Sequence, residues 1–420
     1  MQRLVAFDDG RGQLAPLTDL RASFEVRTGA LTTLERLQAA MPVRLAALWV
    51  PEPLRAVVRP RHAVPVNGDF AGDEPVTLIN GRCVLPPDGA LALQPGEALV
   101  EAGSGDIVAA RVDVKAARAF LRGEAPTWKA TRTTSGACLM SRPWDVRRWR
   151  DEAIALDLRL LLSPAEQPGD PATEPELFED TPGAVARGGA EALRLGGQPV
   201  RVDPRARVLP GSILDAEKGS IVIAQCATVR PGAVLIGPCY VGPHAQVLER
   251  ATIRPNTAIG PWCKVNGEVG GVIFQGYSNK AHDGYLGDSY VGEWVNLGAG
   301  TTNSNLLNTY GEIVARATPG GKHERTGQTF LGAIIGDHVK TAICTRLMTG
   351  CVLHTGGMFA TTAAVQGCTP RFCWCTDEGE REYRVEKFLE VMRAAMARRQ
   401  IEPSEPYVQR VRSLAEQKQA

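Results

Sequence analysis

The chain has 420 residues, enough for two or three domains that each bury a core of their own. Its 47 basic and 46 acidic residues leave a net charge of +1, so no overall field favours nucleic acid or a membrane surface. Apolar runs stay below the roughly 18 residues of a membrane span, and no signal-peptide pattern is present. Cys226, Cys239 and Cys263 fall at small inward positions and are interpreted as hydrophobes of a reducing compartment. We expect a cytoplasmic protein without nucleic-acid or membrane partners.

Residues 1–165 are predicted to form an α/β domain with a mostly parallel sheet. Residues 4–7 and 76–79 are apolar strand candidates, and a helix is expected to start within 32–37. A further helix is expected over 143–162, with apolar residues on one face. Residues 166–195 are predicted to be a linker because their first half is rich in proline and acidic residues.

In residues 196–370, aliphatic side chains repeat with a period of six residues. Such a period fits neither a helix nor a single strand, and it is typical of a parallel β-helix in which each hexad forms one flat side and one corner. After a break the repeat is expected to resume with Tyr285, Val291 and Leu297 inward, and 306–333 is predicted to leave the prism. Residues 371–420 are predicted to be a helical tail, with helices near 378–398 and 404–418. Eight successive hexads carry an aliphatic residue expected to fill the prism: Ile223, Val229, Leu235, Val241, Val247, Ile253, Ile259 and Val265.

Residues 10–18, G-R-G-Q-L-A-P-L-T, resemble the phosphate loop of sugar-1-phosphate nucleotidyltransferases, G-x-G-T-R-L-x-P-L-T. In that family the glycine loop wraps the nucleotide phosphates, cations neutralise them, and an Asp after an apolar strand holds Mg²⁺. Here Asn80 stands where that Asp is expected, so we expect little nucleotidyl transfer, and Mg²⁺ only if the domain is active. The resemblance implies a nucleotide loop of Gly10, Arg11 and Gly12, with Arg21 as the nearby cation.

Residues 282–305 resemble the acetyltransferase half of the bifunctional glucosamine-1-phosphate acetyltransferase/N-acetylglucosamine-1-phosphate uridylyltransferase family. They contain H-x-x-Y-L-G-D, then V-N-x-G-A-G-T and a following Asn, at the family's spacing. The domain order is also that of the family, and the likeness is closest to a divergent bacterial branch with a truncated N-terminal half. The resemblance implies a left-handed β-helix, acetyl-CoA as co-substrate and a homotrimer.

Matching positions in this motif imply individual roles. His282 would be the general base, and Asn305 would position the amine and the thioester. An attacking amine must lose a proton, and histidine is the side chain that titrates nearest to neutral pH. Tyr285 would contact the sugar phosphate and Asn296 the sugar. Lys264 and Lys280 would be the phosphate-binding cations, and the Ala299 backbone would contact acetyl-CoA.

The sequence thus predicts an acetyl-CoA-dependent N-acetyltransferase acting on an amino-sugar phosphate similar to glucosamine 1-phosphate. One alternative is a sugar-1-phosphate nucleotidyltransferase, similar to UDP-N-acetylglucosamine diphosphorylase, whose β-helix serves oligomerisation. Another is a non-enzymatic scaffold that binds a sugar nucleotide. We expect no metal site. Two sets of side chains are the alternatives: Cys368, Cys373 and Cys375 for zinc, and His244, His282 and His338 for a site like that of hexapeptide carbonic anhydrases.

Overall fold

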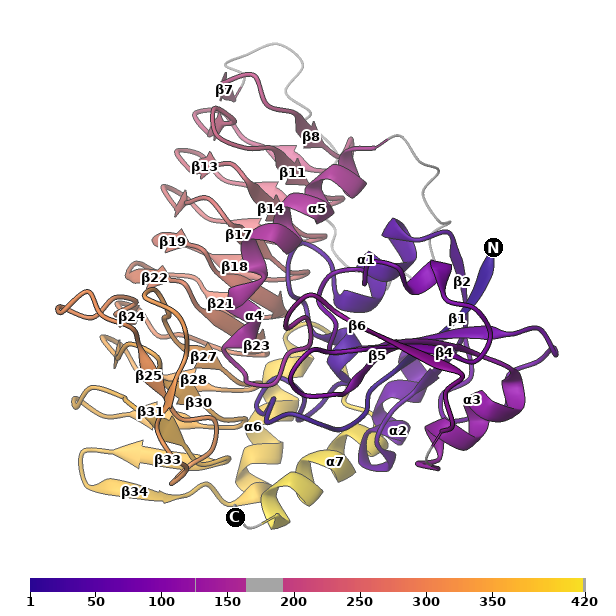
Figure 1. Cartoon of the computed structure of the whole chain (residues 1–420). Coiled ribbons are helices and arrows are strands. Elements are labelled where there is room, and N and C mark those ends of the chain that lie inside the picture. The colour runs from indigo at the N-terminus through magenta and orange to yellow at the C-terminus, as the bar shows by residue number, and fades with distance from the viewer. Residues whose placement is uncertain (125, 164–191, 418–420) are drawn as a thin grey trace.

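The computed structural model describes residues 1–124, 126–163 and 192–417, so most of the predicted linker lies outside the described residues. An α/β domain is followed by a tall prism of stacked coils, and two helices end the chain beside the last coils (Figure 1). Within these ranges no helix is long and apolar enough to span a membrane.

The N-terminal domain is built on a six-stranded sheet in the order β2-β1-β3-β5-β4-β6. Strand β1 pairs in parallel with β2 and β3, and β4 with β6, whereas β5 runs antiparallel to both its neighbours, so the sheet is mostly parallel, as predicted. The strands are β1 Gln2–Phe7, β2 Val43–Trp49, β3 Val76–Asn80, β4 Glu97–Val100, β5 Ile107–Val112 and β6 Ala130–Thr133. The helices are α1 Thr33–Ala40, α2 Glu52–Val58, α3 Val114–Leu121, α4 Asp145–Arg148 and α5 Arg150–Leu162.

The prism is a left-handed parallel β-helix with three flat sides, which we call faces 1, 2 and 3. Face 1 contains β7 Leu193–Leu195, β10 Ile213–Asp215, β13 Val234–Ile236, β16 Thr252–Ile253, β19 Glu268–Gly270 and β22 Tyr285–Gly287, followed by β24 Thr302–Asn303 and β29 Arg346–Leu347. Face 2 contains β8 Val200–Val202, β11 Ile221–Ile223, β14 Cys239–Val241, β17 Thr257–Ile259, β20 Ile273–Gly276, β23 Tyr290–Glu293, β27 Ile334–Ile335, β30 Val352–Leu353 and β32 Cys368–Thr369. Face 3 contains β9 Arg207–Val208, β12 Thr228–Val229, β15 Gln246–Val247, β18 Lys264–Val265 and β21 Asn279–Lys280, then β28 Lys340–Thr341, β31 Met358–Ala360, β33 Cys373–Thr376 and β34 Gly379–Glu382.

The hexad prediction is confirmed over its whole strict run. All eight aliphatic residues from Ile223 to Val265 are at most 1% exposed and belong to one core. Two details were wrong. Cys226 is only half-buried, at a corner with φ +56°, although Cys239 and Cys263 are buried as expected. Leu286, not Tyr285, points into the prism, because the core positions of faces 1 and 2 are five residues apart in this coil.

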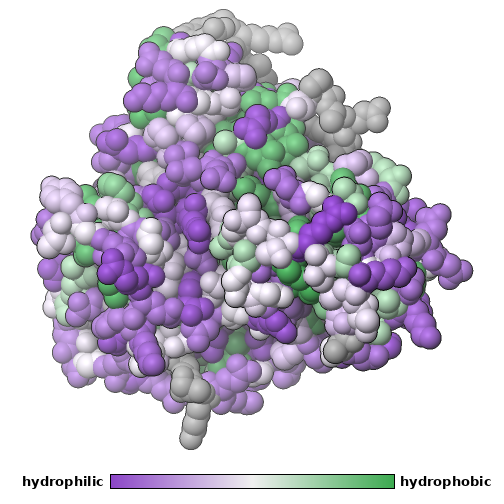
Figure 2. Space-filling view, in the orientation of Figure 1, coloured by the Kyte–Doolittle hydropathy of each residue, from purple (hydrophilic) through white to green (hydrophobic). Residues whose placement is uncertain are grey.

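The N-terminal domain covers face 2. Outward side chains of this face, such as Val222 and Tyr240, are buried in one core with Ile154 and Leu158 of α5. Figure 2 shows hydrophobic residues at this junction, where α5 lies, on a surface that is otherwise mostly hydrophilic. The excursion predicted at 306–333 leaves the coil between β24 and β27 and contains the hairpin of β25 Val314–Ala315 and β26 Glu324–Arg325.

Two C-terminal helices, α6 Val385–Ala397 and α7 Glu405–Glu416, pack beside the lower coils and beneath the N-terminal domain (Figure 1). The predicted apolar stripe of α6 is present, since Phe388, Met392 and Met396 are buried and pack with Trp294 of the prism. Helix α7 contacts α2, so the tail joins both domains.

Replacing Val241 by Asp should abolish cooperative folding of the prism. Val241 is fully buried in face 2, and an unpaired carboxylate there has no partner, so the expected loss of unfolding free energy exceeds about 4 kcal/mol. Thermal unfolding followed by circular dichroism measures this. Val202→Asp is the matched control, since Val202 is in the same column but 38% exposed at the open end. Equal melting of the two variants would contradict the inward assignment of Val241.

Candidate functional site

His282 lies at the corner between faces 3 and 1, in the coil that joins β21 to β22. Its side chain is exposed, and within the described part of the chain its ring makes no hydrogen bond or ion pair. The ring nitrogens are therefore free to meet a ligand. The next corner along the prism stacks directly on this one. The backbones approach so closely that a Cβ on Gly284 would overlap the Thr301 carbonyl oxygen.

Lys280 fixes this corner from inside the prism. It pairs with Val265 in the inward column of face 3 and is 1% exposed. Its ammonium donates hydrogen bonds to the carbonyl oxygens of Asn266 at 2.8 Å, His282 at 2.9 Å and Asp283 at 3.2 Å, and burial lowers the pKa of Lys280 to about 8. The expectation that Lys280 binds a substrate phosphate is corrected, since its charge is used to hold the backbone of His282.

Tyr285 and Asn305, which are 20 residues apart, meet at face 1. The Asn305 amide donates to the Tyr285 phenol oxygen at 3.0 Å and to Asp288 Oδ2 at 2.8 Å. Burial, together with the charge of Asp288, raises the pKa of Tyr285, so its hydroxyl stays protonated and can donate to a ligand. Gly287 leaves room for the Tyr285 ring in this position, because a Cβ there would overlap the phenol oxygen and the ring carbon beside it.

Two arginines of the N-terminal domain complete this cluster. Arg150 of α5 contacts Asp288 Oδ1 at 2.7 Å, and Arg147 of α4 contacts the same oxygen at 3.2 Å. Asp288 is the last residue of the H-x-x-Y-L-G-D motif, so the sequence indicated it, although it was not among the predicted site residues. The sequence carried no signal for Arg147 and Arg150, which reach the prism only through the docking of the two domains.

Asn296 and Lys264 lie on face 3, on the other side of the His282 corner. Asn296 is exposed and bridges the backbones of Asn279 and Lys340, while Lys264 pairs with Asn279 in the same outward column. Ala299 is half-buried, and its carbonyl oxygen accepts a hydrogen bond from the Cys344 amide. The predicted residues therefore form two groups, at face 1 and at face 3, with His282 at the corner between them.

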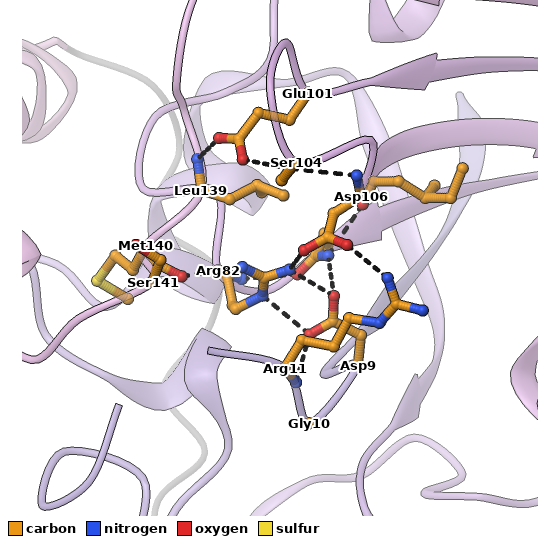
Figure 3. Close-up of polar contacts among 12 residues, drawn as sticks. Asp9, Gly10, Arg11, Arg82, Glu101, Ser104, Asp106, Leu139, Met140 and Ser141 are labelled. Carbon is orange, nitrogen blue, oxygen red and sulfur yellow. Dashed lines mark hydrogen bonds and ion pairs between the residues drawn. The ribbon is translucent and has the colours of Figure 1, made fainter. Parts of the chain in front are cut away.

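The glycine turn of the N-terminal domain leads into a network of charges (Figure 3). Arg82 donates to Asp9 Oδ1 at 2.9 Å and Oδ2 at 2.7 Å, and it also contacts Asp106 Oδ2 at 2.5 Å. Asn80 donates to Asp9 Oδ2 at 2.8 Å, and the exposed Arg11 pairs with Asp106. Although burial opposes it, hydrogen bonds from Arg82 and Arg11 hold the pKa of Asp106 below its usual range.

These residues do not fit a Mg²⁺ ion. A divalent cation needs free carboxylate oxygens, and Arg82 binds both oxygens of Asp9 while Arg82 and Arg11 bind one oxygen each of Asp106. Asp8 is no substitute, because it accepts from the Gly10 and Ser23 amides and burial raises its pKa. In the residues that the structure describes, no group of three His, Cys, Asp or Glu side chains is arranged to hold a metal ion. His338, one of the three histidines of the alternative metal site, is buried, and its ring shares a hydrogen bond of 2.7 Å with the Tyr407 hydroxyl.

A pocket of about 770 Å³ lies beside the loop that contains Gly10 and Gly12. Its charged lining comprises four carboxylates and two guanidinium groups: Asp8, Asp9, Glu52, Glu124, Arg11 and Arg122. Arg11 pairs with Asp106 and Arg122 with Glu124, so both cations are engaged. A triphosphate needs cations, and this surplus of carboxylates repels it.

Arg21 is not part of the nucleotide loop. It is 1% exposed and forms ion pairs with Asp337 at 2.9 Å and Glu293 at 3.0 Å, both on the prism. A guanidinium so placed ties the two domains together, and the expectation of a phosphate contact is corrected. Asp19 has a similar role through Arg371, at 2.7 Å.

Residues 4–165 match the family model described as sugar nucleotidyl transferase. This part of the chain is similar to that family. A stretch of 136 residues is similar to the bifunctional sugar-1-phosphate nucleotidylyltransferase/acetyltransferase of Sulfurisphaera tokodaii, with 34% identity over 32% of this chain and 33% of the relative. Part of the chain is also similar to the bifunctional protein GlmU of Gloeothece citriformis, with 33% identity over 29% of this chain and 25% of the relative.

The match therefore spans a third or less of the length of these relatives. Among solved structures, the UDP-N-acetylglucosamine acyltransferase of Francisella novicida has a TM-score of 0.31 and 11% identity, over 51% of this chain and 75% of that one. A likeness at this level carries no conclusion on function. In this chain the region that matches the sugar nucleotidyl transferase model precedes the prism, which is the order that the sequence predicted.

The sugar nucleotidyl transferase domain should not release pyrophosphate. The assay mixes the protein with Mg²⁺, each nucleoside triphosphate and N-acetylglucosamine 1-phosphate. We expect background rates, because Arg82 holds the carboxylates of Asp9 and Asp106 and the adjoining pocket is acidic. A turnover number of about 1 s⁻¹ or more, which is the low end of the range for ordinary enzymes, would contradict this interpretation.

Proposed function

We propose that the protein is an acetyl-CoA-dependent N-acetyltransferase that acts on an amino-sugar phosphate such as glucosamine 1-phosphate. The observation that carries this proposal is the hydrogen bond between Asn305 and Tyr285, next to the His282 corner. It joins two motif residues that are distant in sequence. The relative in Sulfurisphaera tokodaii, named a bifunctional sugar-1-phosphate nucleotidylyltransferase/acetyltransferase, supports the same assignment.

In the proposed reaction the amine nitrogen attacks the thioester carbonyl carbon, so that a C–N bond forms and the C–S bond breaks. The ring of His282 takes the proton that the amine loses, and that proton can return to the departing thiolate. Tyr285 donates to an oxygen of the sugar. Both N–H groups of Asn305 are engaged by Tyr285 and Asp288, so its Oδ1 accepts from the amine and orients it for attack. Lys280 acts as a positioning residue, because it holds the carbonyl of His282.

The N-terminal domain has a structural role in this proposal. Its arginines Arg147 and Arg150 hold Asp288, which in turn accepts from Asn305. The domain thus supports the acyl-transfer site from behind, and it does not transfer nucleotides itself.

Replacing His282 by Ala should reduce thiol release from acetyl-CoA by about 10²–10⁴-fold, the usual effect of losing a general base. Melting should be unchanged, because the side chain is exposed and lies outside the core of the prism. His323→Ala is the matched control, since His323 is another exposed histidine, in the excursion after β24. Full turnover in the His282 variant would remove it from the mechanism.

The active assembly is proposed to be a homotrimer, with acetyl-CoA held between neighbouring prisms. Face 1 can supply the contact, because outward residues such as Leu193 and Leu195 of β7 are exposed there. Light scattering should give about three times the 45.1 kDa mass of the chain. A fully active monomer would contradict both the trimer and the shared site.

A further inference from the structure

Face 3 and the end of α6 enclose a pocket of about 300 Å³, which we call the cation pocket. The stacked rings of Tyr277 and Trp294, with centroids 4.6 Å apart, line one side. Three cations line it and no carboxylate does, in contrast to the acidic pocket of the N-terminal domain. Its polar side chains come from two distant segments of the chain: Asn279, Asn296 and Lys340 on the prism, and Arg398 and Arg399 after α6.

Among the described residues, two cations of this pocket have no side-chain partner, the exposed Arg398 and the half-buried Lys340. Lys340 is the more costly of the two because it is buried more deeply. It neighbours Asn296 in the outward column of face 3, and its ammonium makes no hydrogen bond or ion pair with any residue that the structure describes. Burial lowers the pKa of Lys340 to about 8. Arg399, by contrast, donates to Asn279 Oδ1 at 3.0 Å. A half-buried ammonium beside two guanidinium groups is unfavourable unless an anion compensates it.

Lys264 extends the same positive region. It precedes Asn279 in the column, and burial, followed by the charges of Arg399 and Arg398, lowers the pKa of Lys264. The negative C-terminal end of the α6 dipole also stabilises the charges of Arg398 and Arg399, but that effect is confined to the last turn of a helix. It gives no reason for Lys340, on the prism, to face the same cavity.

We propose that the cation pocket binds a phosphate monoester group. Two substrates of the proposed reaction contain one, the 3′-phosphate of coenzyme A and the phosphate of the amino sugar, and to this extent the inference rests on the proposed function. The ammonium of Lys340 supplies a compact charge. The guanidinium groups of Arg398 and Arg399 supply paired donors that match phosphate oxygens. Asn296, the predicted sugar contact, lies at the same pocket.

The test measures binding to the full-length protein by isothermal titration calorimetry, without turnover. The ligands are coenzyme A, 3′-dephospho-coenzyme A, glucosamine 1-phosphate and glucosamine. The variants are Lys340→Met and Arg398→Gln; because Arg398 is exposed, the second should fold normally even if the first does not. Arg393→Gln is the matched control, since Arg393 is exposed on α6, one turn before Arg398, and outside the pocket.

Both pocket variants should weaken one phosphorylated ligand about tenfold or more, as expected for a lost charged hydrogen bond, and the control should not. If coenzyme A weakens and its dephospho form does not, the group is the 3′-phosphate. If glucosamine 1-phosphate weakens and glucosamine does not, it is the sugar phosphate. Unchanged binding, no binding by the wild type, or equal weakening in Arg393→Gln would overturn the proposal.

The same variants separate this inference from the proposed function. Loss of binding in the pocket variants of a protein that transfers no acetyl group would reject the acyltransferase and keep the phosphate site. Normal acetyl transfer with unaltered binding would reject the phosphate site alone.

Discussion

Each coil of the prism must place one side chain per face into a dry, continuous core. Where that side chain is polar, its hydrogen bonds have to be satisfied inside the chain, because no water is available. Lys280, Asn303 and Thr341 occupy such inward positions. The Asn303 amide group exchanges two hydrogen bonds with the backbone of Gly287, and Thr341 accepts from the Gly298 amide. These exceptions cluster in the coils that contain the candidate site, so the site is shaped from within the prism.

The N-terminal domain has the α/β fold that the nucleotidyltransferase resemblance implies, but its charged side chains bind one another and the prism. Asp9 and Asp106 bind Arg82, and Arg21 binds Asp337 across the domain interface. Buried ion pairs of this kind contribute little net stability, but removing one partner costs several kcal/mol, about 3–5, because a charge is then left unpaired. Arg21 therefore holds the domain against the prism, and Arg82 keeps Asp9 and Asp106 engaged within the domain. Acyl transfer, as proposed above, would then take place on the prism.

Sequence reasoning predicted the prism well because its signal is periodic and local. The aliphatic residues from Ile223 to Val265 needed only a count of six. The count failed at Tyr285 because counting back six from Val291 misses the shortened coil, in which Leu286 is the inward residue. That error concealed a useful fact, since an outward Tyr285 is free to meet Asn305.

The remaining site residues could not be predicted, because they meet only through the tertiary fold. Arg150 reaches Asp288 across 138 residues of sequence, and Arg399 reaches Asn279 across 120. Lys280 was expected to bind the substrate phosphate because the resemblance implies cations upstream of the His282 motif. Only the register with Val265 shows that it points inward.

The central claim is that the prism transfers an acetyl group to a free amine. The most direct measurement is thiol release from acetyl-CoA by the wild-type protein, with glucosamine 1-phosphate compared with N-acetylglucosamine 1-phosphate, whose amine is blocked. The account predicts thiol release with the first sugar and only background with the second. Equal rates with the two sugars, or none with either, would contradict it.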